Sequence, residues 1–313
     1  MSSYLNLFKN NNLSIDDVIN LYELKKSIFP VPKRKGRMEK ANSIDEISDK
    51  FDAFIFDSFG VLNVGSILIN NVPSALNKLK RKEKIITVLT NGASYPTSKK
   101  LETFNNWKLP FNSSEVISSR DLLKTHLKGE KEITWGVIGS PGSDLVELGI
   151  KGHILGKNMN QIKKCEGVIY LGCEFWDHEN QKILEDHISN KPLKVLVGNP
   201  DIIAPQKSSF SIEPGFWSFN FHQSEISKPL YFGKPHTQIF ELAIKRIMTL
   251  SNKSISLDRI AMVGDSLHTD ILGGLSSNIS TILVTNHGLF KDYDYYNAID
   301  KTKIFPDWII PSL

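Results

Sequence analysis

Short apolar runs alternate with helical segments along most of this chain, and this alternation is the feature that most restricts its fold. Apolar runs without a polar face are typical of strands that are buried on both sides of a parallel sheet. The first and last parts of the chain predict strands at 51–56, 85–89, 230–232, 259–263 and 281–284, and helices at 73–80, 96–107, 236–249 and 269–275. We therefore expect an α/β fold whose open, Rossmann-like parallel sheet is covered by helices on both faces.

A second α/β series interrupts this pattern. It predicts strands at 133–138, 168–171 and 193–197, and helices at 143–148 and 177–188. A self-contained series inside another indicates an inserted domain. The expected organisation is an N-terminal helical extension with a basic linker at 1–45, a core at 46–115, an inserted α/β domain at 116–228 and the rest of the core at 229–313.

The N-terminal extension carries its own local signals. Ser14 and Asp17 form a helix-start signature, and Pro30 and Pro32 end the helix that follows. The basic residues at 33–37 are interpreted as a solvent-exposed linker, with a phosphate-binding or partner-binding arm as the alternative.

Composition excludes several classes of protein. The 38 Lys and Arg residues against 34 Asp and Glu residues give a net charge of +4, which is too mild and too dispersed for a nucleic-acid partner. No apolar run approaches the length of a membrane span, and the polar N-terminus is not a signal peptide, so no membrane partner is expected. The two cysteines are interpreted as packing residues of a reducing, cytoplasmic compartment.

Four polar segments follow predicted core strands. Asp57 comes directly after the first strand, and Thr90, Asn91 and Gly92 follow the second. Lys234 stands after the strand at 230–232, and Asp265 and Asp270 flank the turn after the strand at 259–263. Because the carboxyl ends of parallel strands meet at one edge of a sheet, these side chains are expected to converge.

In this order, an aspartate nucleophile, a Thr-Asn donor pair, a lysine and a paired-aspartate turn, the segments resemble the four motifs of the haloacid dehalogenase (HAD) superfamily. With Gly233-Lys234-Pro235, Asn199-Pro200-Asp201 and the C-terminal run from Pro306, residues 48–313 resemble its subclass IIA, the nitrophenyl-phosphatase-like enzymes. The resemblance implies an α/β cap domain inserted into the core. It also implies that the backbone carbonyl of Phe59 is a metal ligand.

The chemistry of these residues is that of a phosphatase. Asp57 would attack a phosphate monoester and form an aspartyl-phosphate, with Thr90, Asn91 and Lys234 stabilising the phosphoryl group. An all-oxygen cluster of Asp57, Asp265 and Asp270 suits Mg²⁺. The expected function is therefore the Mg²⁺-dependent hydrolysis of a small phosphorylated metabolite.

Phe59 is a departure from the resemblance, because this position usually holds a second aspartate that protonates the leaving group. A general acid is typically worth about 10²- to 10⁴-fold in rate. Three hypotheses follow: a phosphatase with an easier leaving group or a donor such as His236 or His268, a catalytically impaired protein that binds a phosphorylated ligand or partner, or a dehalogenase. We also predict that the chain resembles a branch of the family that has an aromatic residue at this position.

The inserted domain is expected to supply specificity rather than chemistry. Gly92, Asn199 and Asp201 are the predicted substrate-binding residues, and the aromatic pairs Phe175-Trp176 and Phe216-Trp217 are either specificity contacts or the interior of the cap. Caps of this subclass also form dimers, so the resemblance implies a homodimer through the cap.

Overall fold

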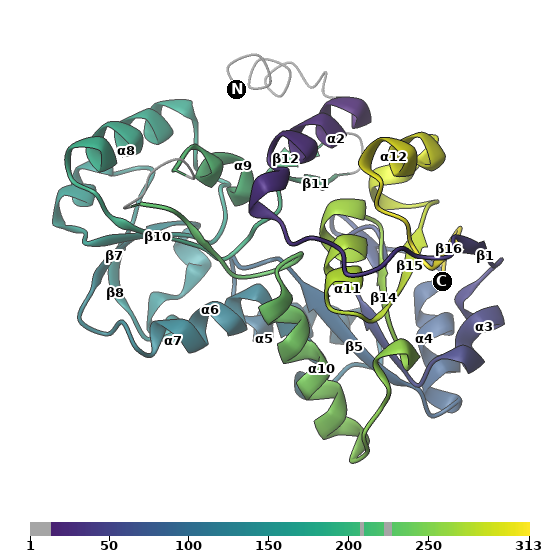
Figure 1. Cartoon of the computed structure of the whole chain (residues 1–313). Helices are drawn as coiled ribbons and strands as arrows, with labels where there is room; N and C mark the ends of the chain where they lie inside the picture. Colours follow the sequence, from purple (N-terminus) through teal and green to yellow (C-terminus); the bar gives the residue numbers. More distant parts are fainter. Residues whose placement is uncertain (1–13, 207–209, 222–226) are drawn as a thin grey trace.

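Two parallel sheets form the framework of the protein (Figure 1). The computed structural model describes residues 14–206, 210–221 and 227–313. The expected α/β fold class is confirmed, because helices flank both sheets. Among the described helices, none is both long and apolar enough to cross a membrane.

The larger sheet has seven strands in the order β1-β16-β15-β14-β2-β5-β6, and all neighbours are parallel. The central strands β2 and β14 are buried on both faces, which explains their uninterrupted apolar sequences. The strands are β1 (Glu39–Lys40), β2 (Ala53–Phe56), β5 (Ile85–Thr90), β6 (Val116–Ser118), β14 (Ile260–Gly264), β15 (Ser280–Val284) and β16 (Trp308–Ile310).

Alternate residues of β2 face opposite layers of helices. Phe54 and Phe56 pack with residues of α4 (Val72–Arg81) and α5 (Thr97–Asn106), whereas Ala53 and Ile55 pack with α10 (Thr237–Ser251). Apart from the strand predicted at 230–232, the predicted helices and strands of the core lie where the sequence places them, to within a few residues. The core also contains α3 (Ile44–Ile47), α11 (Leu272–Ser276), α12 (Tyr295–Thr302) and the hairpin of β3 (Asn63–Val64) and β4 (Ile67–Leu68).

The smaller, five-stranded sheet belongs to the inserted part of the chain. Its order is β13-β10-β9-β7-β8, again with parallel neighbours. The strands are β7 (Thr134–Ile138), β8 (Lys151–Ile154), β9 (Gly167–Tyr170), β10 (Lys194–Val197) and β13 (Leu230–Tyr231). The accompanying elements are α6 (Ser119–Leu127), α7 (Leu145–Leu148), α8 (His178–Asn190), α9 (Pro214–Ser218) and the hairpin of β11 (Ile203–Pro205) and β12 (Phe210–Ile212). We call residues 119–231 the cap.

One predicted strand and one predicted domain boundary differ from the structure. The strand expected at 230–232 as part of the core is β13, which pairs with β10 at the edge of the cap sheet. Conversely, Val116–Ser118 pairs with β5 and belongs to the core sheet, although 116 was the expected start of the inserted domain. Apolar periodicity reports the burial of a strand but not its partner, so it could neither assign residues 230–232 to the cap sheet nor locate the boundary after residue 118.

The N-terminal segment is integrated into the fold. The predicted Ser14–Asp17 capping box is present and starts α2 (Ile15–Leu24). Farther along, β1 adds an edge strand to the core sheet. Within the basic run, both guanidinium Nη atoms of Arg34 donate to the carboxylate of Asp307 at 2.6 Å, so this part is not the freely solvated linker that was expected.

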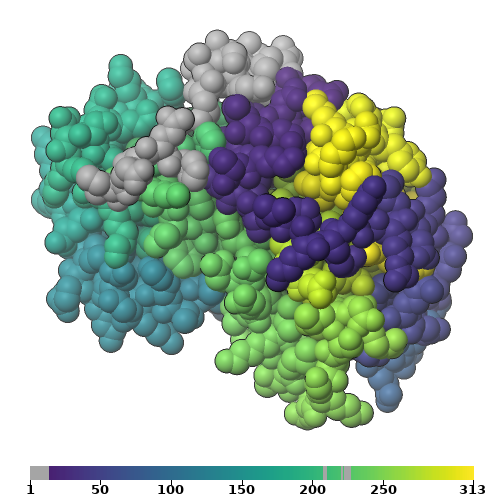
Figure 2. All heavy atoms as spheres, viewed as in Figure 1, coloured from purple at the N-terminus to yellow at the C-terminus, as the bar shows by residue number. Residues whose placement is uncertain are grey.

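Helix α2 also joins the cap to the core. The space-filling view shows the purple N-terminal segment against both the green cap residues and the yellow C-terminal residues (Figure 2). The buried Lys25 ammonium donates to the carbonyl oxygens of Gly215 and Phe216 in the cap, at 3.2 and 2.8 Å. On the core side, Glu23 contacts His268 at 2.9 Å.

Candidate active site

The site lies where the strand order of the core sheet reverses. From β2 the chain proceeds to β5 and β6 on one side, and β14, β15 and β16 lie on the other. Asp57 follows β2 and Asp265 follows the neighbouring β14, and the Asp57 amide donates to the carbonyl of Val263 at 2.9 Å. Such a reversal opens a crevice at the carboxyl ends of the strands, which is a preferred place for ligands.

Glycines permit the close approach of the chain to Asp265. A Cβ atom at Gly288 would lie 1.8 Å from Asp265 Oδ2, and one at Gly60 would lie 2.1 Å from it. Both glycines have positive φ, at 68° and 76°. The Leu289 amide donates to the same oxygen at 2.8 Å, so backbone groups fix the orientation of this carboxylate.

Lys234 links two of the carboxylates. Its ammonium lies 2.6 Å from Asp57 Oδ1 and 2.6 Å from Asp270 Oδ1, and the side chain is buried. Burial lowers the pKa of Lys234, but the negative charges of Asp270 and Asp57 outweigh it and raise the pKa above its ordinary value. Lys234 is therefore a permanent cation at the nucleophile.

Asn91 determines where Lys234 stands. Its Oδ1 accepts from the Lys234 amide at 2.7 Å, and its Nδ2 donates to the Lys234 carbonyl at 2.9 Å and to Asp201 Oδ1 at 2.8 Å. One buried amide thus joins the end of β5, the loop after the cap strand β13 and a cap loop. Lys234 reaches the core through this contact, and not at the end of a core strand as the sequence predicts.

The three aspartates form a group that could hold a cation. Carboxylate oxygens of Asp57, Asp265 and Asp270 all lie within 4.8 Å of one another. Burial raises the pKa of Asp265 and of Asp270, and the charge of Asp270 raises that of Asp265 further. A buried, all-oxygen set with this excess of negative charge fits a hard divalent cation such as Mg²⁺.

A cavity of about 770 Å³ opens above these residues, between the core and the cap. Of the residues predicted for the site, Lys234 and Asp270 are buried and do not line the cavity, and those that line it are Asp57, Phe59, Thr90, Asn91, Gly92, Asn199, Asp201 and Asp265. The structure therefore brings the predicted residues together, while their chemical roles stay predictions.

The cap loop contributes two carboxyl groups to the cavity. The Asp201 amide donates to Asn199 Oδ1 at 3.0 Å, and Asn199 Nδ2 donates to Glu213 Oε2 at 3.0 Å. Burial raises the pKa of Asp201 and that of Glu213 to about 7 in each case. Sequence analysis missed Glu213, because it stands in no motif and is brought to the loop by contacts with Asn199 and Ile202.

The two histidines considered as proton donors do not line the cavity. His236 stacks on Tyr231 with ring centroids 5.3 Å apart, and burial lowers its pKa to about 4. His268 stacks on Tyr22 at 4.7 Å and its Nε2 contacts Glu23. His268 therefore packs against α2 and His236 against Tyr231, and neither candidate histidine reaches the cavity as a proton donor.

The aromatic pairs of the cap are also outside the cavity lining. Trp176, Phe216 and Trp217 are buried among the apolar residues of the cap, whereas Phe175 is 42% exposed. Of the two interpretations, the interior of the cap is the one that fits three of these four side chains. Tyr22 of α2 is instead the aromatic residue that reaches the cavity from outside the core.

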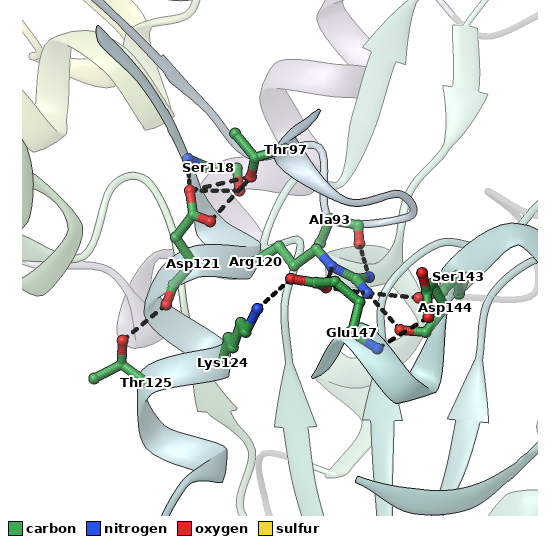
Figure 3. A network of polar contacts seen from close by, with 10 residues as sticks. All are labelled: Ala93, Thr97, Ser118, Arg120, Asp121, Lys124, Thr125, Ser143, Asp144 and Glu147. Carbon is green, nitrogen blue, oxygen red and sulfur yellow. Dashed lines mark hydrogen bonds and ion pairs between the residues drawn. The ribbon is translucent and has the colours of Figure 1, made fainter. Parts of the chain in front are cut away.

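Arg120 is a further residue that sequence analysis missed. The buried guanidinium donates to the carbonyl oxygens of Ala93, Ser143 and Asp144 at 3.1, 2.6 and 2.9 Å (Figure 3). Its Nε donates to Glu147 Oε2 at 3.0 Å. Arg120 thereby connects the loop that follows Thr90 and Asn91 to the cap.

Comparison with known proteins gives the family. Residues 54–151 match the family model of haloacid dehalogenase-like hydrolases, and residues 231–313 match a model described as HAD-hydrolase-like. The two matches contain the nucleophile segment and the paired-aspartate segment, respectively. The chain belongs to the haloacid dehalogenase-like hydrolases.

Curated relatives and solved structures agree with this family. The chain is 24% identical over 297 residues to a 4-nitrophenylphosphatase of Schizosaccharomyces pombe, with 88% of this chain and 97% of the relative covered. It is 24% identical over 286 residues to the chloroplastic phosphoglycolate phosphatase 1A of Arabidopsis thaliana, with 85% and 77% covered. The expected resemblance to subclass IIA is thus supported.

A solved structure from Cytophaga hutchinsonii, described as a possible sugar phosphatase of the HAD superfamily, has a TM-score of 0.75 and 25% identity. The alignment covers 88% of this chain and 98% of that one. The prediction of an enzyme of the HAD superfamily is therefore confirmed, and the core-plus-cap architecture is shared with a solved HAD protein.

Proposed function

We propose that this HAD hydrolase is an Mg²⁺-dependent phosphatase of a small phosphate monoester. The observation that carries the proposal is the arrangement around Lys234, whose ammonium lies 2.6 Å from both Asp57 and Asp270, with Asp265 completing the acidic group. A phosphoryl group needs a nucleophile and nearby cations, and these residues provide both. The relatives from Schizosaccharomyces pombe and Arabidopsis thaliana are phosphatases, which supports the same reaction.

Asp57 is the nucleophile in this proposal. Its side chain is 14% exposed, so one oxygen can bind Lys234 while the carboxylate still faces the cavity. Attack on phosphorus gives an aspartyl-phosphate, and water then hydrolyses it. Thr90 and Asn91 line the same cavity, at the end of the neighbouring strand β5.

Asp57, Asp265 and Asp270 would hold Mg²⁺, with the backbone carbonyl of Phe59 as a further ligand by family resemblance. The ion would neutralise negative charge on the phosphoryl oxygens. The dehalogenase hypothesis receives no support from this acidic group, because a halide substrate has no need of it.

The substrate is proposed to be a small phosphorylated metabolite that enters between the core and the cap. Asp201, Asn199 and Gly92 line the cavity and are the proposed specificity contacts. A homodimer through the cap, as the subclass resemblance implies, is part of the proposal.

The effect of Phe59 on the rate decides whether this protein is an active or an impaired phosphatase. Phe59 lines the cavity, and its side chain cannot protonate a leaving group. We expect the wild type to hydrolyse 4-nitrophenyl phosphate in Mg²⁺ and to lose this activity on chelation. Asp57→Asn should lower turnover by at least about 10³-fold, because no aspartyl-phosphate can form.

Phe59→Asp is the companion variant. Turnover that appears only in Phe59→Asp would indicate that the natural chain binds phosphorylated ligands without efficient hydrolysis. Turnover that persists in Asp57→Asn, or halide release without metal, would contradict the proposed mechanism.

A further inference from the structure

Lys100 lines the cavity close to the Thr90 hydroxyl. It lies in the first turn of α5, and its Nζ donates to Thr90 Oγ1 at 3.1 Å. The same atom lies 5.4 Å from the centroid of the Phe59 ring. Lys100 is therefore beside the side chain that replaces the usual acid.

The surroundings of Lys100 lack a counter-charge in direct contact. Among the described residues, Lys100 forms no ion pair, whereas Lys234 has two carboxylate partners. Burial lowers the pKa of Lys100 to about 8, although the charge of Asp57 opposes this effect. A lysine in the first turn of a helix is also disfavoured by the helix dipole. These costs would be offset by an anionic ligand.

Gly92 leaves the space that this ammonium occupies. A Cβ atom at Gly92 would lie 2.9 Å from Lys100 Nζ and 3.5 Å from Thr90 Oγ1. The absence of a side chain at 92 thus allows Lys100 to approach the Thr90 hydroxyl, which is itself a predicted contact of the phosphoryl group. This geometry places the ammonium close to a phosphate ester bound at Asp57.

We propose that Lys100 is a catalytic residue that binds the leaving-group oxygen of the substrate and stabilises the negative charge that develops on it. The proposal deepens the proposed phosphatase function and rests on it. The positive charge of Lys100 would compensate in part for the proton that Phe59 cannot donate to the leaving group. A preorganised cation in a water-poor site is an effective way to stabilise such charge.

The transfer of the phosphoryl group to Asp57 needs no proton from Lys100. Asp57 Oδ forms a bond to phosphorus, and the bond between phosphorus and the ester oxygen breaks with its electron pair left on that oxygen. The Lys100 ammonium donates a hydrogen bond to this oxygen, which takes its proton from water. The hydroxide that remains attacks the aspartyl-phosphate and releases hydrogen phosphate and the Asp57 carboxylate.

The test compares two esters of similar shape, phenyl phosphate and 4-nitrophenyl phosphate, in wild type and Lys100→Met. Nitrophenolate spreads its own charge and needs less help from the enzyme. We expect kcat/KM to fall about 10²-fold for phenyl phosphate and only about tenfold for 4-nitrophenyl phosphate. Lys100→Arg, which keeps the charge, should recover part of the loss on phenyl phosphate.

A matched control and a rescue variant separate chemistry from folding. Lys245→Met makes the same substitution at an exposed position of α10 and should leave both rates unchanged. Phe59→Asp in the Lys100→Met background should restore phenyl phosphate hydrolysis, because it returns an acid to the leaving group. Equal losses on the two esters, or no loss, would overturn the role of Lys100.

A failure of the phosphatase proposal can be distinguished from a failure of the Lys100 proposal. If wild type hydrolyses neither ester, the proposed function fails, and the Lys100 contact is then measured by calorimetric titration of phenyl phosphate. About tenfold weaker binding in Lys100→Met would support the contact, and equal affinities would overturn it.

Discussion

Single buried polar side chains hold this site together. Asn91 pairs with both backbone groups of Lys234 and with Asp201, and Arg120 binds three carbonyl oxygens around the Ala93 loop. Buried polar groups of this kind are costly to disturb, because each partner left behind has lost its contact with water as well. The positions of Thr90 and Asn91 thus depend on residues outside the recognisable motifs.

Arg120→Met is expected to lower the free energy of unfolding by about 3 kcal/mol, because it leaves buried carbonyl groups without a donor. Lys124→Met is the matched control, since Lys124 pairs with the same Glu147 but is 39% exposed. The control should change stability by less than about 1 kcal/mol. Equal urea midpoints for the two variants would contradict the structural role of Arg120.

Glu213 should make stability depend on pH. Its pKa is raised to about 7 in the folded state, above that of an unfolded chain, so the folded state binds more protons between these two values. Stability from this group is full below the unfolded pKa and falls as pH rises through about 7. In Glu213→Gln, this pH-dependent fall in the free energy of unfolding should be smaller by up to about 3 kcal/mol.

Urea unfolding of wild type and Glu213→Gln at pH 5 and pH 8 measures this effect. The exposed Glu241→Gln is the control and should keep the pH response of wild type. A Glu213→Gln variant whose stability falls between pH 5 and pH 8 as much as that of wild type would contradict the assignment.

At the scale of elements, α2 behaves as a brace between the cap and the core. Tyr22 accepts a hydrogen bond from the Ile202 amide at 3.2 Å and stacks on His268, so one side chain contacts both bodies and the cavity. Lys25 binds two carbonyl oxygens of the cap. The solved relative from Cytophaga hutchinsonii aligns with 88% of this chain, while 98% of its own length is covered, so this chain has additional segments.

Lys25→Ala should destabilise the protein by about 3 kcal/mol, since it leaves a void and removes two buried hydrogen bonds between this segment and the cap. Lys26→Ala, one residue along, removes a lysine that is 59% exposed and should cost less than about 1 kcal/mol. Guanidinium unfolding of the full chain measures both variants. A Lys25→Ala loss no larger than that of Lys26→Ala would show that α2 does not brace the cap in this way.

At the scale of the whole molecule, the acidic group unites distant parts of the sequence. Asp57 lies in the first segment that matches the family, and Asp265 and Asp270 lie in the second. A cation bound by all three stabilises the folded chain alone, because the unfolded chain does not bring these residues together. At about 100 times the dissociation constant, this linkage amounts to about 2.7 kcal/mol.

Saturating Mg²⁺ should therefore raise the melting temperature of wild type by several degrees. Asp265→Asn should melt higher than wild type in the absence of metal, because it removes one of the mutually repelling carboxylates, and should lose most of the response to Mg²⁺. Scanning calorimetry with and without Mg²⁺ tests both effects. An unchanged Mg²⁺ response in Asp265→Asn would contradict the proposed metal ligands.

The sequence by itself determined the main strands and helices, the family and the motif residues, because apolar periodicity and short motifs are local properties of a chain. It did not determine that Leu230–Tyr231 joins the cap sheet or that Asn91 positions Lys234. Nor did it show that Lys100 and Glu213 belong to the site while His236 and His268 do not. These outcomes depend on contacts between residues far apart in the sequence, and only the packing of the tertiary structure decided them.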